Sequence, residues 1–225
     1  MLALVLPLVL ASAVEVERVL AVVNGVPILA SDAELAQVAG LVPRQAGESD
    51  GDYRSVVIEA LVSLELRWQD LAAAGVTARP PADADAAWRA TVQRTGGEDE
   101  LHRRLEAIGL GERELRDLVR RAAVVQAYVA TRFAPFARPS QREVEAAWQK
   151  ELAPQLEKAG KPVPPLAEVR GEVETLLRER KLTGEVERWT ADLAKRAEIV
   201  RYVPGVAEAA AATPAPAPTP AGPSN

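Results

Sequence analysis

The sequence is poor in the side chains on which most enzymes and metal sites depend. Among 225 residues it has no cysteine, one histidine, one methionine and few aromatic residues, namely four Trp, three Tyr and two Phe. Without cysteine the chain forms no disulfide, thiol nucleophile or thiolate metal ligand, so packing alone must hold the fold. The single histidine, His102, has no nucleophile or orienting partner within one helical turn, which indicates a solvated surface residue rather than a general base.

The other candidates for catalysis or ligand binding have simpler structural explanations. The acidic pairs Asp50/Asp52 and Asp83/Asp85 stand in loops or at helix starts, where capping and the helix dipole favour carboxylates. The glycines at 96–97 and at 109 and 111 follow predicted helices rather than strands, so we interpret them as helix ends and not as phosphate loops. We therefore expect no catalytic residue, no metal site and no cofactor.

The charge of the chain gives no reason to bind nucleic acid. Its 27 basic and 32 acidic residues give a net charge of −5, and the two signs are interspersed along the sequence. Even the most basic stretch, residues 103–121, alternates arginine with glutamate and aspartate, which is typical of a solvated helix face with i, i+4 ion pairs.

The first residues have the pattern of a targeting signal. Leu2–Leu10 is an uninterrupted apolar run, too short to span a membrane, and Ala11-Ser12-Ala13 is typical of a signal-peptide cleavage site. No Lys or Arg precedes the run, which leaves open a start further upstream or an N-terminal hydrophobic strand or helix. We expect a signal peptide over residues 1–13, export to the periplasm, and no stable membrane insertion after cleavage.

A β-hairpin is predicted directly after this segment. Two apolar runs, 19–23 and 26–29, flank Asn24-Gly25, the dipeptide that most readily adopts two positive φ angles. Pro27 cannot donate a ladder hydrogen bond, so its strand should be an edge strand. Ser31 and Glu34 have capping-box spacing, so the second strand should pass straight into a helix. An isolated hairpin is marginally stable, so it needs a third strand or a packed helix.

The rest of the chain has the apolar spacing of amphipathic helices. Helices are predicted at 32–41, 57–75, 82–94, 98–108 and 111–133, then one that Ser140 and Glu143 cap and Pro154 ends or kinks, and a long one from Leu166. The helix at 57–75 is apolar around most of its girth and should be central. In 82–94 the best candidates for burial are Trp88 and Val92. The long helix has two apolar halves that are out of phase, so it either bends near Thr183-Gly184 or gives its halves different neighbours.

The end of the chain has two distinct patterns. Residues 198–203 predict a terminal strand. Residues 207–225 are almost entirely Ala, Pro, Thr and Gly, so we expect a disordered tail.

Several segments together resemble one known family. Val19–Asp32 is similar to the opening of SurA-type periplasmic chaperones and their parvulin relatives, in which a hairpin feeds a capped helix. Residues 57–76, 138–145 and 166–200 resemble that family's second long helix, the segment before its isomerase domain, and its C-terminal helix and last strand. The resemblance implies one mainly α, multi-helix chaperone module over residues 14–206, with 18–157 as its N-terminal part and 165–203 as its C-terminal helix and strand. It also implies a small antiparallel sheet in which the last strand joins the N-terminal hairpin.

One departure from the family narrows the expected function. The family's parvulin domain normally lies between two segments that here are separated only by Leu152–Pro164, which is too short for a domain, and the residues of a parvulin site have no counterparts. The resemblance therefore implies an ATP-independent holdase for unfolded or partly folded envelope and outer-membrane proteins, without prolyl isomerase activity. Two alternatives stay open: an interaction or assembly protein with one envelope partner, and an isomerase-family member by analogy.

Client binding is expected in a cradle between the central helices and the helix at 166–197. The candidate residues are apolar and stand near helix ends or breaks, where a groove could open: Leu110, Leu115, Trp148 and Leu152.

Overall fold

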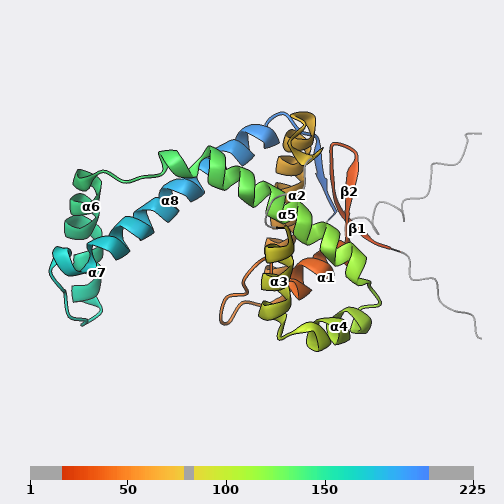
Figure 1. Cartoon of the computed structure of the whole chain (residues 1–225), viewed down its shortest axis with the longest axis horizontal. Coiled ribbons are helices and arrows are strands. Elements are labelled where there is room, and N and C mark those ends of the chain that lie inside the picture. Colours follow the sequence, from red (N-terminus) through yellow and green to blue (C-terminus); the bar gives the residue numbers. More distant parts are fainter. Residues whose placement is uncertain (1–16, 79–83, 203–225) are drawn as a thin grey trace, which may run out of the picture.

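A computed structural model describes residues 17–78 and 84–202 of the chain. The predicted signal peptide, the last residue of the predicted terminal strand and the predicted tail lie outside these residues. The described part is mainly α-helical with one small antiparallel sheet, which confirms the predicted fold class. Figure 1 shows that most helices gather around the sheet and that one group of helices projects away from it.

The elements follow one another with short connections. In chain order they are β1 (Val19–Val23), β2 (Val26–Leu29), α1 (Ala30–Val38), α2 (Asp50–Ala73), the 3-10 turn η1 (Val76–Ala78), α3 (Ala84–Thr95), α4 (Glu98–Ala107), α5 (Glu112–Arg132), the 3-10 turn η2 (Ala134–Phe136), α6 (Gln141–Ala147), the π-helical segment η3 (Trp148–Leu152), α7 (Ala153–Lys158), α8 (Leu166–Ala194) and β3 (Ile199–Arg201).

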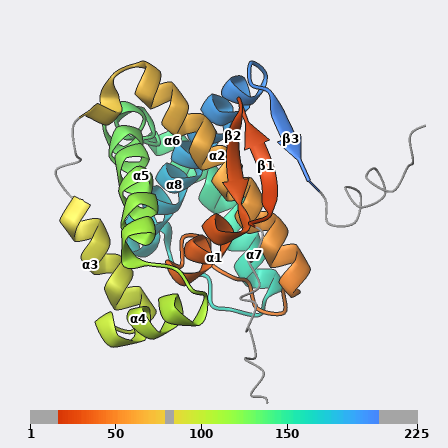
Figure 2. The same cartoon turned by 90° about the vertical axis from the view of Figure 1, so that its right-hand side faces the viewer.

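The sheet joins the two ends of the described chain. Its strand order is β2-β1-β3, so β1 lies in the middle, between β2 and β3 (Figure 2). Both pairings are antiparallel. Asn24 and Gly25 have φ angles of 49° and 82°, as a two-residue hairpin turn requires. The predicted hairpin, its edge strand with Pro27 and the third strand are confirmed.

Asn24 does more than form the turn. Its backbone N–H donates to Glu198 O at 2.8 Å, and its side-chain Oδ1 accepts the Glu198 N–H at 2.8 Å. Its Nδ2 donates to Gln69 Oε1 of α2 at 2.8 Å. The hairpin turn is therefore bonded both to the segment before β3 and to α2. We call this set of hydrogen bonds the clasp.

The start of α1 corrects one prediction. The helix begins at Ala30, and Asp32 Oδ2 accepts the Leu29 N–H at 2.8 Å, whereas the predicted capping box of Ser31 and Glu34 is wrong. The reason is that the chain enters the helix two residues earlier than the sequence pattern indicated. A carboxylate in the first turn satisfies a backbone donor that the helix itself leaves without a partner.

The helix α2 is central, as its apolar girth predicted. It contacts α1, α5, α8, β1 and β2. Ser49 begins it, with Oγ accepting the Asp52 N–H at 3.1 Å, and Gly75 follows its end with a φ of 72°.

In α3 the buried residues differ from those predicted. Thr91 and Thr95 are buried, whereas Trp88 and Val92 are only half-buried. Thr91 Oγ1 donates to Ala87 O at 3.0 Å and Thr95 Oγ1 to Val92 O at 2.8 Å, so neither hydroxyl is left without a partner. The periodicity alone could not show this because a bonded threonine packs as well as an aliphatic residue of its size.

Around Pro154 the helix neither ends nor simply kinks. α6, η3 and α7 form one continuous helical stretch, and Pro154 lies at the start of α7. Directly before it the helix widens to π geometry, with the Ala153 N–H donating to Trp148 O. The wider turn accommodates the proline ring, which would otherwise clash with the carbonyl four residues earlier. The predicted capping box before this stretch is confirmed, since Ser140 Oγ accepts the Glu143 N–H at 3.3 Å and Glu143 Oε2 accepts the Ser140 N–H at 2.7 Å.

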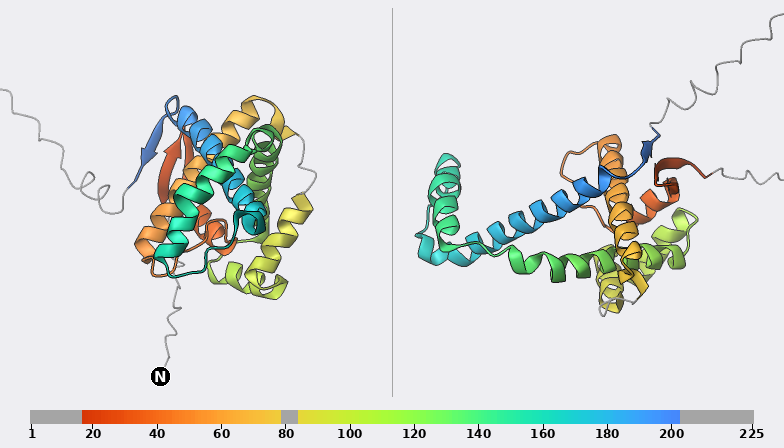
Figure 3. Two further views of the ribbon diagram at one scale, coloured as in Figure 1. Left: turned by 90° about the vertical axis from the view of Figure 1, so that its left-hand side faces the viewer. Right: turned by 90° about the horizontal axis from the view of Figure 1, so that it is seen from above.

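The long helix α8 connects two parts of the molecule. Its first half contacts α6, and its second half contacts α2. Of the two predicted explanations for its apolar phase shift, different neighbours for the two halves is therefore confirmed. Figure 1 and the right panel of Figure 3 show the result: the first half of α8 (residues 166–181) with α6, η3 and α7 forms an arm, and the remaining elements form a body.

Three clusters of buried side chains form the core of the body. The largest packs the sheet on α1, α2 and Leu193 of α8. The second joins α1, α4 and α5, with Leu115 fully buried at its centre, and the third joins Leu71 of α2 to Val124 and Val125 of α5. Sheet and helices thus form one continuous body, from which the arm projects.

Candidate functional site

An apolar pocket opens between α2, α5 and the body half of α8. Its volume is about 290 Å³. The lining residues are Ala36, Leu41, Val42, Val57, Ala60, Leu61, Leu64, Arg67, Ala122, Val125, Gln126, Val129 and Val186. Only two of them are polar. We call this the cradle pocket, because it lies where a cradle between the central helices and the long C-terminal helix was predicted.

The floor of the cradle pocket belongs to the packed core. Val57, Leu61 and Val125 are at most 6 % exposed. By contrast, Leu64 and Val129 are half-buried. An apolar side chain could therefore enter between partly exposed walls without any rearrangement of the core beneath.

Arg67 is the one charged residue that lines the cradle pocket. Its Nε donates to Ser63 O at 2.8 Å within α2. Burial lowers the pKa of the guanidinium, and no carboxylate among the described residues contributes to that pKa. An arginine has five N–H donors, so the remaining ones can bind carbonyl or carboxylate oxygens of an incoming chain.

An aromatic cluster fixes the body half of α8 beside this pocket. The Trp189 ring of α8 lies 5.4 Å from the Tyr128 ring and 5.5 Å from the Phe133 ring, measured between centroids. Trp189 Nε1 donates to Asp70 Oδ2 of α2 at 3.1 Å. Three helices therefore meet at one tryptophan, which fixes the direction in which α8 leaves the body.

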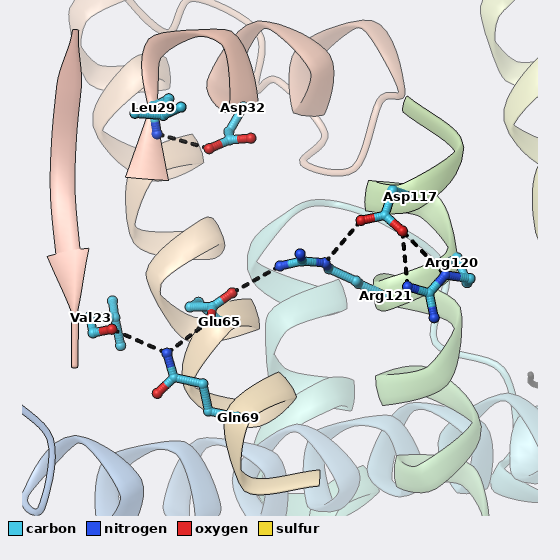
Figure 4. Close-up of polar contacts among 8 residues, drawn as sticks. All are labelled: Val23, Leu29, Asp32, Glu65, Gln69, Asp117, Arg120 and Arg121. Atoms are coloured by element: carbon cyan, nitrogen blue, oxygen red, sulfur yellow. Dashed lines mark hydrogen bonds and ion pairs between the residues drawn. The ribbon is translucent and has the colours of Figure 1, made fainter. Parts of the chain in front are cut away.

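A network of polar side chains crosses the other side of the body (Figure 4). Arg121 of α5 lies between two carboxylates, with Nη1 3.2 Å from Glu65 Oε2 and Nε 3.4 Å from Asp117 Oδ2. Gln69 Nε2 donates to Glu65 Oε1 at 2.8 Å and to Val23 O of β1 at 3.1 Å. The network thus links the sheet, α2 and α5.

This network lines a second pocket of about 450 Å³, beside β2. Asp32 also lines it, and burial raises the pKa of the Asp32 carboxyl, while the Leu29 N–H and the charge of Arg121 lower it. The carboxylates at 65 and 117 are bonded to arginines, and Asp32 accepts a backbone N–H. We therefore interpret the network as structural, because its carboxylates are committed to partners and no activated nucleophile adjoins it in the part of the chain described.

The sequence did not reveal this network. Its two central residues are 56 positions apart in the chain. The only signal is Glu65 itself, an acidic residue inside the apolar segment Leu61–Leu66. In the fold Glu65 is only 8 % exposed. A charge on a central helix needs a partner, but the pattern cannot say which of the many arginines provides it.

The four predicted client-binding residues are not brought together. Leu110 is half-buried and lines the second pocket, and Leu115 is completely buried, so it cannot touch a bound chain in this conformation. Trp148 and Leu152 lie in the π-helical segment of the arm, both half-buried. The cradle pocket instead uses Val57, Leu61 and Leu64, which lie on one apolar row of α2, and the later turns of α5. Leu64 is only half-buried although it shares that row with the core residues Val57 and Leu61, so the apolar spacing alone could not separate the pocket from the core.

Other kinds of site find no support in the residues that the structure covers. Within 17–78 and 84–202, no group of three or more His, Asp or Glu side chains is placed to hold a metal ion. His102 is exposed, as predicted, but it does have a carboxylate neighbour one turn away, since its Nε2 lies 3.3 Å from Glu106 Oε1 on the same helix. In the same residues, no helix has the length and apolar character that crossing a membrane requires.

Neither a protein-family model nor a curated protein matches this chain. The cradle pocket, the projecting arm and the sheet are therefore the features from which a function has to be argued.

Proposed function

We propose that this protein is an exported, ATP-independent holdase of the periplasm. It binds unfolded or partly folded envelope proteins, outer-membrane proteins among them, and it lacks prolyl isomerase activity. The observation that carries the proposal is the cradle pocket, an apolar pocket with partly exposed walls at the base of a projecting arm. Such a surface recognises apolar side chains in general, which are what unfolded chains expose and folded ones do not.

The connection between body and arm adds a second apolar contact point. Phe136 in η2 is 72 % exposed, the largest exposure among the large apolar residues of the described chain. An isolated exposed apolar residue is ordinary, but this one lies in the segment that joins α5 to the arm. A client chain passing from the body to the arm would meet it.

The size of the cradle pocket sets the mode of binding. Burying one Leu- or Phe-sized client side chain contributes roughly 1.5–3 kcal/mol, and micromolar affinity requires about 8 kcal/mol after the costs of association. A pocket of about 290 Å³ takes only one or two such side chains. A client must therefore bind at several points at once, which fits an elongated molecule with an arm better than a single deep site.

The segment where relatives carry a parvulin domain supports the absence of isomerase activity. Here that segment, Leu152–Pro164, holds only the end of η3, α7 and most of the connection to α8. Turnover of a proline-containing test peptide no faster than the spontaneous rate is the expected result, and catalysed turnover would contradict this part of the proposal.

The proposal is tested by placing a charge in the cradle pocket. Val129→Glu puts a carboxylate on a pocket wall, and Ala130→Glu puts the same carboxylate on the exposed neighbouring position of α5. Suppression of aggregation of a denatured outer-membrane protein should fall several-fold for Val129→Glu and stay unchanged for Ala130→Glu. Circular dichroism checks that both variants keep their helix content.

Two results would contradict the proposal. If the unaltered protein fails to delay aggregation at a several-fold molar excess, the holdase function is lost. If it holds one envelope protein in a fixed ratio and has no effect on a second, unrelated client, then the interaction with a single partner replaces general holding.

A further inference from the structure

The two edges of the sheet differ in whether another strand can join them. On β2, Pro27 has no N–H, and the Leu29 N–H is already taken by Asp32 Oδ2 at 2.8 Å. Val22 of β1 lies between Pro27 and Val200, and its backbone groups face Val200 of β3. The pair of Val22 and Pro27 is therefore not hydrogen-bonded, and the backbone groups of Pro27 point away from β1. The donors on the outer side of β2 are therefore missing or occupied, which protects that edge against pairing.

The outer edge of β3 has no such protection among the described residues. Asn24 N–H bonds Glu198 O and Tyr202 N–H bonds Leu20 O, so residues 198, 200 and 202 turn their backbone groups towards β1. In an antiparallel ladder the residues between them turn theirs outward. The N–H and C=O groups of Ile199 and Arg201 therefore form a short, open ladder, and Figure 2 shows no described element beside it.

A groove of about 400 Å³ lies along this edge. Its apolar part comes from α2, α8 and β3, and charged residues complete it. The lining residues are Glu59, Val62, Ser63, Leu66, Arg67, Val186, Glu187, Thr190, Ala191, Ala194, Ile199 and Arg201. A strand added about 4.8 Å beyond β3 would place alternate side chains over this groove and the others in solvent.

The groove adjoins the cradle pocket. Arg67 and Val186 line both of them. A chain with one apolar side chain in the cradle pocket can therefore continue past Val186 into the groove. Two of the charged residues of the groove are paired with each other, since Arg201 and Glu59 form a bidentate ion pair, with Arg201 Nη2 2.8 Å from Glu59 Oε2.

We propose that the β3 edge and its groove bind an extended segment of the client by strand addition. The occupant is a short β-strand with small apolar residues at alternate positions, a pattern typical of outer-membrane β-strands. An open ladder of backbone donors and acceptors is matched only by another extended backbone. Because backbone groups supply the hydrogen bonds, recognition tolerates many sequences. This inference rests on the proposed holdase function and names the conformation in which the client is held.

Amide hydrogen exchange on the full-length, ¹⁵N-labelled protein tests the proposal. The probe is a ten-residue peptide in which valine and threonine alternate between terminal lysines. The amides of Ile199 and Arg201 should exchange freely without the peptide and at least tenfold more slowly at saturation, whereas the Val200 amide is slow in both states. In an added antiparallel strand the valines lie over the groove and also turn their backbone groups towards β3, so a control peptide with N-methylated valines should give much less protection.

Two outcomes of this measurement would overturn strand addition. One is that the peptide binds while exchange at residues 199 and 201 stays unchanged. The other is that these two amides are already protected in the free protein. Protection that disappears on dilution would then assign the edge to a second copy, and protection that persists would assign it to the chain itself.

A pair of variants gives an independent test. Ile199→Pro and Ile199→Ala both remove the same side chain, but only proline removes the outward N–H. Peptide affinity should be at least tenfold lower for Ile199→Pro than for Ile199→Ala, and equal affinities would contradict the proposal. If the proline variant does not fold, as judged by protection of the Val200 amide, the exchange experiment on the unaltered protein still decides.

The failure of this inference can be told apart from the failure of the holdase function. If the protein suppresses aggregation and loses that activity with Val129→Glu, but residues 199 and 201 show no protection, then clients bind through the cradle pocket without strand addition. If the protein neither suppresses aggregation nor binds the peptide, both proposals are lost.

Discussion

The body and the arm are built from the same kind of helix but are held together very differently. The body encloses three clusters of buried apolar side chains, whereas in the arm only Val144 and Val173 are buried. Two ion pairs supplement them, Lys181 Nζ to Glu143 Oε1 and Arg180 Nη1 to Glu151 Oε1, both at 2.7 Å. Since exposed ion pairs contribute little, the body sets the global stability and the arm can open on its own.

Under the proposed holdase function, the body and the arm would have different tasks: the body would keep an apolar surface open, and the arm would adapt to the client. A rigid floor under the cradle pocket keeps the apolar surface from collapsing when no client is bound. An arm with few buried contacts can adjust to clients of different size at a small cost in free energy. The predictions below test whether body and arm are independent in this way, beginning with the largest expected effect.

The largest effect is expected in the body. Leu115→Ala removes a fully buried side chain from the second cluster and should lower the free energy of unfolding by about 2–5 kcal/mol. The matched control is Leu118→Ala, three residues further on the same helix but only half-buried, which should cost less. Urea unfolding followed by circular dichroism measures both, and equal losses would contradict the assignment of the core.

A smaller and more local effect is expected in the arm. Val144→Ala should weaken the packing of α6 on α8 by about 1–2 kcal/mol. Amide exchange of α6 should accelerate roughly 5- to 30-fold, while exchange in α2 and α5 should stay the same. If the amides of α2 accelerated as well, arm and body would form one cooperative unit.

The smallest effect is a difference in the response to acid. The Lys181 ammonium, followed by the backbone and hydroxyl of Ser140, lowers the pKa of Glu143 in the arm from 4.5 to about 2. The contribution of the Glu143 carboxylate to stability is therefore fully present above pH 4.5 and is lost as the pH falls towards 2. In the body, burial raises the pKa of Asp32 above 3.8, so its contribution is present at low pH and is lost as the pH rises through the raised pKa.

Carboxyl titration by ¹³C NMR checks this contrast. Asp32 should titrate above 3.8 and Glu143 near 2, and acidification should loosen α6 before it affects the sheet. In Glu143→Gln the side-chain oxygen can still cap α6, but the acid response of the arm should disappear. If the unaltered arm responds to acid as the body does, Glu143 is not its determinant.

Local signals made much of the fold predictable. Asn24-Gly25 placed both strands of the hairpin, and Ser140 with Glu143 placed the start of α6, because these residues act within four positions of one another. The start of α1 was predicted two residues too late, because the carboxylate of Asp32, and not the hydroxyl of Ser31, bonds a free backbone N–H at the helix start. The π-helical segment before Pro154 was also missed, since only the packing of the arm keeps that helix continuous.

The candidate site was harder to predict because it depends on distances that no short pattern contains. A pocket lies where the resemblance led us to expect a cradle, but the residues that line it did not follow from the sequence. Leu64 of α2, Val129 of α5 and Val186 of α8 meet only because Trp189 fixes the path of α8. The open edge of β3 was equally invisible, since it follows from the pairing register and not from the sequence of the strand.

The clasp has a consequence for how the molecule is made. Asn24 and Glu198 are 174 residues apart, so β1 gains its second partner only after the segment around Ile199 has emerged. Until then the side of β1 that β3 later covers is exposed. Any nascent chain interrupted before Ile199 keeps it exposed permanently.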